Sequence, residues 1–78
     1  INNAYLIWGL QALLPNSKIK QLLMLATTDE RNEYARLEAI KVLLMYYATD
    51  KDVKSRLKQM KRSDSSMVKI GIKKITGD

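Results

Sequence analysis

Residues 34–48, YARLEAIKVLLMYYA, decide the fold of this chain. The stretch is long enough for a helix of about four turns, and its only ionised side chains are Arg36, Glu38 and Lys41. A helix at a protein surface is apolar along one stripe, whereas a helix that is apolar nearly all round must be covered on several sides. In a chain of 78 residues, that cover has to come from the helices immediately before and after it.

Two helices are expected before this central helix. Pro15 ends a leading helix over residues 3–14. Ser17 is expected to cap a second helix, whose apolar side chains recur at spacings of three and four residues. These side chains are Ile19, Leu22, Leu23 and Ala26. The polar residues 27–33 then form a loop before the central helix begins.

Two further helices are expected after the central helix, separated by the polar residues 62–66. Thr49 is expected to cap the first of them, with Asp52 at the third position of a capping box. The second is expected over residues 67–76, and Gly77 ends it. The apolar stripes of the two helices are Val53, Leu57 and Met60, and Val68, Ile72 and Ile75. Because every clear apolar pattern has the helical period, the predicted fold class is all-α.

Internal repetition is the most specific feature of the sequence. The apolar positions of the second helix recur in the fourth helix at an offset of 34 residues, and residues 34–37 match residues 67–70 at an offset of 33. The repeated unit is a helix, a polar turn that contains aspartate, and a second helix. It occurs twice, over residues 17–48 and 50–77, after the leading helix.

In this repeated pattern, the chain resembles a run of HEAT repeats, an α-solenoid family built from paired antiparallel helices. The family's most recognisable feature is an acidic turn followed by a Val-Arg pair that opens the second helix. Residues 64–69, DSSMVK, are similar, as are residues 29–36, in which Ala35 replaces the valine. Gly71 and Ile72 stand where small helix formers are usual in the family. The resemblance implies a single domain over residues 1–78, a short right-handed solenoid fragment of about five helices.

The resemblance also implies roles for two basic residues and for the chain as a whole. Arg36 and Lys69 would bond to turn carboxylates such as Asp29 or Asp64 and so tie neighbouring units together. A solenoid normally needs about three units for independent stability, and this chain begins at Ile1 and carries two. We therefore expect it to be a piece of a longer protein or a processed product.

The composition argues against catalysis and against metal binding. Cysteine and histidine are absent, which excludes disulfides, zinc sites built on those residues and histidine acid–base chemistry. The aspartates fall in turns or at helix starts, where they cap backbone donors, and no glycine-rich phosphate loop occurs. We expect no enzyme activity, no cofactor and no small-molecule substrate. The apolar residues 4–14 are too few to span a bilayer, which takes about 20. The compartment is left open, although a cytoplasmic one is favoured.

The positive charge of the chain is confined to its second half. The formal net charge is +6, and residues 41–78 carry all of it, with ten lysines and arginines against four aspartates. Such asymmetry is typical of proteins with an anionic partner, but a lysine-rich genome or a solubilising surface produces it too. One basic stripe consists of Lys51, Lys54, Lys58 and Lys61, and a second cluster of Lys69, Lys73 and Lys74. Each is either a solvated helix face or a surface for phosphates or an acidic protein.

The expected function follows from the resemblance to HEAT repeats, which implies a non-catalytic protein-interaction or scaffold module. In that family the second helix of each pair lines the concave face. The contact candidates on those helices are Glu38, Lys41, Met45, Ile70, Lys73 and Lys74. Ile70 lies roughly opposite the apolar stripe of its helix, so a continuing repeat covers it or it is displayed for binding. The alternative is a module that binds nucleic-acid backbone through its basic half.

Overall fold

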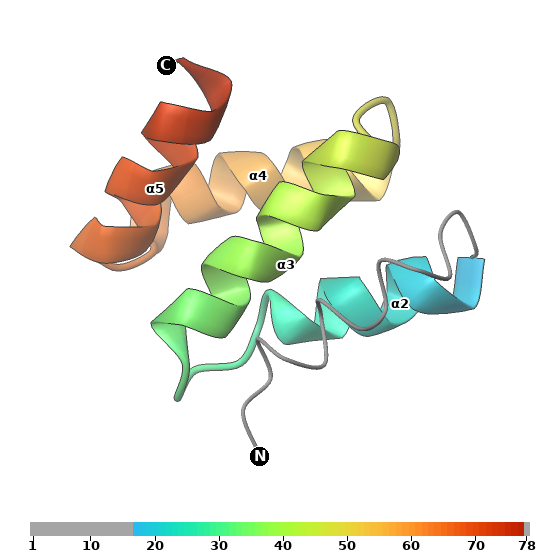
Figure 1. The fold of residues 1–78 in the computed structure, drawn as a ribbon, viewed down its shortest axis with the longest axis horizontal. Helices are drawn as coiled ribbons and strands as arrows, with labels where there is room; N and C mark the ends of the chain where they lie inside the picture. The colour runs from blue at the N-terminus through green and yellow to red at the C-terminus, as the bar shows by residue number, and fades with distance from the viewer. Residues whose placement is uncertain (1–16, 78) are drawn as a thin grey trace.

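The computed structural model describes residues 17–77, and over this range it consists of four α-helices without any strand (Figure 1). These helices are α2 (Ser17–Ala26), α3 (Glu33–Tyr46), α4 (Lys51–Ser63) and α5 (Ser66–Thr76). The prediction of an all-α fold is therefore confirmed for these residues. The leading helix expected over residues 3–14 lies outside the described range. None of the described helices is long and apolar enough to span a bilayer.

Side-chain caps explain where the last three helices begin. The Asn32 side chain accepts a hydrogen bond from the backbone N–H of Ala35 at the start of α3. At the start of α4 the cap is Asp50 rather than the predicted Thr49, because its carboxylate accepts from two backbone N–H groups of the first turn. Ser65 caps α5, and Gly77 ends that helix in the left-handed conformation with φ of 80°.

Helix α3 lies at the centre of the described structure and packs against α2, α4 and α5 (Figure 1). Ile40 and Val42 are completely buried although they point to different sides of the helix, as expected for a helix covered on several sides. The core consists of Ile19, Leu23, Ala35, Ala39, Ile40, Val42, Leu43, Val53, Met60, Val68 and Ile72. Two side chains predicted to be buried, Leu22 and Ile75, are instead 46% and 39% exposed, since they lie at the edges of their apolar stripes.

Gly71 of α5 packs directly against the Leu37 side chain of α3. A Cβ atom at this position would lie only 2.5 Å from Cδ2 and 2.7 Å from Cδ1 of Leu37. The departure from the usual helix former at Gly71 therefore has a structural reason, because the missing side chain makes room for Leu37.

Candidate functional site

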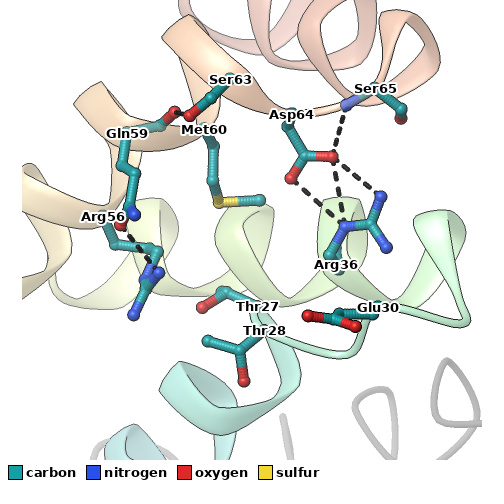
Figure 2. A pocket seen from close by; sticks show the side chains of 10 residues that line it. All are labelled: Thr27, Thr28, Glu30, Arg36, Arg56, Gln59, Met60, Ser63, Asp64 and Ser65. Carbon is teal, nitrogen blue, oxygen red and sulfur yellow. Dashed lines mark hydrogen bonds and ion pairs between the residues drawn. The ribbon is translucent and has the colours of Figure 1, made fainter.

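An ion pair joins the two helix–turn–helix units at one end of the helices. Arg36 Nε donates to both carboxylate oxygens of Asp64 at 3.2 Å, and its Nη2 donates to Oδ1 at 2.8 Å (Figure 2). Both side chains are only 11% exposed. Arg36 Nη1 also donates to the backbone carbonyl of Asp29 at 2.8 Å, so one guanidinium holds the α2–α3 turn and the α4–α5 turn. The hydrogen bond to Asp64 raises the pKa of Arg36, although burial opposes part of this.

The structure confirms this role for Arg36 but not for Lys69. Lys69 is exposed, and its side chain forms no hydrogen bond or ion pair within residues 17–77. The Asp64 carboxylate, its nearest acidic candidate in the sequence pattern, is occupied by Arg36 and by the backbone N–H of Ser65. Nothing in the described part of the chain therefore offers Lys69 the partner that the repeat pattern assigned to it.

A second ion pair links the same two units from α2. Lys20 Nζ lies 2.6 Å from Asp50 Oδ2 and 3.4 Å from Asp52 Oδ2. Its hydrogen bond to Asp50 lowers the pKa of that carboxyl below its ordinary value of 3.8, and the same bond raises the pKa of Lys20 above 10.5. Asp50 thus caps α4 and binds α2 at the same time.

Two hollows share Arg56 and Gln59 of α4, and the second of them also borders α2. The first, about 380 Å³, is also lined by Thr27, Thr28, Glu30, Arg36, Met60, Ser63, Asp64 and Ser65. The second, about 400 Å³, is also lined by Lys20, Gln21, Met24, Asp52 and Ser55. Figure 2 shows Arg56 and Gln59 on one side of the first hollow and the Arg36–Asp64 pair on the other. The first hollow is called the Arg56 cavity below.

Arg56 is the arginine of this cavity that has no acidic partner among residues 17–77. Its Nη1 donates to the Gln59 side-chain oxygen at 2.9 Å (Figure 2). Its Nε is buried and has no hydrogen-bond partner among residues 17–77. By contrast, the second arginine of the cavity, Arg36, is fully engaged by Asp64 and the Asp29 carbonyl. The sequence alone did not indicate this cavity, because its residues come from helices whose proximity no local pattern reveals.

Five of the six predicted contact residues are exposed on the surface. Lys41 and Met45 are exposed on α3, and Ile70, Lys73 and Lys74 are exposed on α5. The sixth, Glu38, is buried, with only 8% of its surface exposed. It forms an interaction with another group, so it is part of the packed structure. Its position on the covered side of α3 removes it from the set of surface contacts.

The exposed residues gather on one side of the Leu37–Gly71 contact. At about 100° per residue, Tyr34, Lys41 and Met45 lie within about a quarter turn of Leu37, on the side away from the core. On α5, Met67, Ile70 and Lys74 lie within about 100° of Gly71, also on the side away from the core. We refer to these six residues together with Lys73 as the α3–α5 outer face. The apolar members Tyr34, Met45, Met67 and Ile70 are 41%, 60%, 40% and 57% exposed.

The basic stripe of α4 lies away from the core, as its spacing predicts. Lys51, Lys54 and Lys58 are exposed, whereas Lys61 is partly buried and interacts with another group. Val53 and Met60 of the same helix are buried on the opposite side. Among residues 17–77, no group of three or more acidic side chains is placed to hold a metal ion.

Comparison of the chain with protein-family models, with curated proteins and with solved structures found no match.

Proposed function

We propose that this chain is a non-catalytic protein-interaction module whose two helix pairs stack in the manner of HEAT repeats. In this proposal, α2 with α3 and α4 with α5 are successive units of a short right-handed solenoid. The packing of α3 against α5 supports it, as does the Arg36–Asp64 pair, which joins the first unit to the turn of the second. The repeated sequence pattern at offsets of 33 and 34 residues gives independent support.

The observation that carries the proposal is the composition of the α3–α5 outer face. Met45 and Ile70 are more than half exposed, and exposed apolar side chains that gather on one surface favour a binding site. Lys41, Lys73 and Lys74 are interspersed among them, and the exposed Glu33 lies next to Tyr34 at the start of α3. A partner suited to this surface has apolar side chains flanked by aspartate or glutamate, because opposite charges steer association and fix orientation.

Site-specific photo-crosslinking tests this proposal. A photoreactive amino acid at Met45 or at Ile70 is expected to capture the same partner protein in cells. The matched control is Leu25 of α2, which is 67% exposed but lies outside the outer face. Capture of one partner from both outer-face positions and not from Leu25 supports the proposal. Equal capture from all three positions, or different proteins from Met45 and Ile70, contradicts it.

A second candidate function is binding of nucleic-acid backbone through α4. Lys51, Lys54 and Lys58 are exposed along one side of that helix, which suits sequence-independent attraction to phosphates. A salt titration against generic duplex DNA and RNA distinguishes it from the first proposal. Binding that weakens steeply with salt and is lost when these three lysines become glutamate supports it, and absence of binding at low salt excludes it.

A further inference from the structure

We propose that the end of the molecule formed by α4 and α5 binds the phosphate backbone of double-stranded nucleic acid. The contacts come from four lysines, which we call the distal face: Lys54, Lys58, Lys69 and Lys73. The inference rests on the second candidate function, which assigns phosphate binding to α4 alone, and it extends that surface onto α5.

The position of Arg56 shows which side of α4 carries the first two lysines. Arg56 lines both hollows, so its side of α4 turns toward α2 and toward the turn that follows α2. Lys54 and Lys58 stand two residues before and two residues after it. At about 100° per residue, each lies about 160° from Arg56, on the side of α4 that turns away from the first helix pair.

Gly71 gives the same information for α5. It packs against Leu37 of α3, and Lys69 and Lys73 stand two residues before and two residues after it. Each of these lysines lies about 160° from Gly71, on the side of α5 that turns away from α3. Figure 1 shows α2 and α5 on opposite sides of α3, and α4 packs against α5. The lysines of both helices therefore belong to one basic surface that faces away from the first helix pair.

The distal face carries positive charge without a compensating carboxylate. Its four lysines are exposed, and their side chains form no hydrogen bond or ion pair within residues 17–77. Helices α4 and α5 and the turn between them contain two acidic residues, and both lie next to basic residues of the first helix pair. Asp52 is beside Lys20, and Asp64 is bonded to Arg36. A face of this kind attracts phosphates, because each lysine that neutralises a phosphate releases a condensed counterion.

The chemistry of the face favours nucleic acid over an acidic protein. Lysine is depleted in protein–protein interfaces, whose centres are apolar. The distal face lacks such a centre, because Leu57 packs against the core and Ile70 lies about 60° round the helix from Lys73, toward the outer face. Residues 51–77 contain no aromatic side chain that could stack on an unpaired base, so a duplex backbone suits the face better than a single strand.

The salt dependence of duplex binding tests the proposal. Fluorescence anisotropy of a labelled mixed-sequence DNA duplex, titrated with the 78-residue chain at several salt concentrations, gives the slope of log K against log [salt]. Each lysine–phosphate contact contributes about 0.9 to this slope, so Lys69→Ala and Lys54→Ala should each reduce its magnitude by about that amount. Lys69→Arg keeps the charge and should bind like the parent chain. Lys41→Ala removes an exposed lysine of α3 and is the matched control, which should leave the slope unchanged.

The possible failures are distinguishable. No duplex binding at low salt removes both this inference and the second candidate function. If binding is lost when Lys51, Lys54 and Lys58 become glutamate but Lys69→Ala keeps the parent slope, only the extension onto α5 is wrong. Equal changes of slope in Lys69→Ala and Lys41→Ala reflect net charge alone and also overturn the inference, as does loss of binding in Lys69→Arg.

Two competitors test the class of ligand. Polyglutamate at the same concentration of negative charge, and a single strand of the same length, are each expected to displace the labelled duplex less effectively than unlabelled duplex does. Stronger competition by polyglutamate assigns the distal face to an acidic protein, and stronger competition by the single strand assigns it to unpaired nucleic acid. Either result overturns the proposal.

Discussion

Arg36 and Asp64, 28 residues apart in the sequence, form a two-point ion pair that is almost shielded from solvent. The pair connects the first turn of α3 to the turn between α4 and α5. Because Arg36 also holds the Asp29 carbonyl, the α2–α3 turn and the α4–α5 turn converge on one side chain. The relative position of the two helix pairs therefore depends on this residue more than on any other polar contact described above.

Replacing Arg36 with alanine is expected to destabilise the protein by about 3–5 kcal/mol, since it leaves the Asp64 carboxylate shielded and without its cation. Arg36→Lys should lose less, because it keeps the charge but not the paired donors. Urea unfolding followed by circular dichroism measures both. Arg31→Ala, which removes an exposed arginine from the neighbouring turn, is the control and should change stability by less than about 0.5 kcal/mol. A loss below about 1 kcal/mol for Arg36→Ala would show that the pair is not structural.

The Lys20–Asp50 pair predicts a specific dependence of stability on acid. Because folding lowers the pKa of Asp50 below 3.8, its contribution is complete above that pH and is lost as the pH falls through the folded pKa. Asp50→Asn retains the helix cap but not the charge, so it should be less stable at pH 6 and should lose less stability below pH 3.8 than the parent chain.

The measurement is urea unfolding at a series of pH values between neutral and strongly acidic. Thr49→Ala serves as the control, since Thr49 is exposed and does not cap α4. Parallel stability curves for Asp50→Asn and the parent chain across the acid range would contradict the assignment.

The contact between Gly71 and Leu37 predicts a coupling between two substitutions. Alanine normally stabilises an exposed helix by about 1 kcal/mol relative to glycine, but here its Cβ meets the end of the Leu37 side chain. Gly71→Ala alone should therefore leave stability unchanged or lower it by about 1–2 kcal/mol, because overpacking offsets the gain. In a Leu37→Ala background, the same substitution should stabilise by about 0.5–1 kcal/mol.

A double-mutant cycle measured by urea unfolding gives the coupling free energy between these positions. Equal effects of Gly71→Ala in both backgrounds would mean that α3 and α5 do not approach each other at this point.

Local sequence patterns were sufficient for the helices and for much of the core. The central helix was predictable because residues 34–48 are apolar on nearly every side, and burial of Ile40 and Val42 agrees with this. The predicted cap of α4 was wrong by one residue. Thr49 and Asp50 are both good caps, and in the structure the Asp50 carboxylate accepts from the first backbone N–H groups and also binds Lys20. The solenoid arrangement stays a prediction.

The candidate sites were less predictable, because they depend on which faces the neighbouring helices cover. Glu38 was predicted as a contact residue because it belongs to the second helix of its pair, but its side chain is buried. Arg56 showed no special pattern in the sequence, and its unpartnered Nε is visible only once α2 and α4 are placed side by side. Exposure of Met45 and Ile70 was predictable from helical spacing, and the partner that they bind was not.

The most direct test of the account is the affinity of the crosslinked partner for two triple variants of equal charge. One variant changes Lys41, Lys73 and Lys74 of the outer face to glutamate, and the other changes the α4 lysines. The α4 set is Lys51, Lys54 and Lys58, and each variant takes the formal net charge from +6 to zero. We expect the outer-face variant to bind at least about tenfold more weakly, which is about 1.4 kcal/mol, and the α4 variant to change affinity less than about twofold. Equal losses in the two variants, or an unchanged affinity in the outer-face variant, would contradict the account.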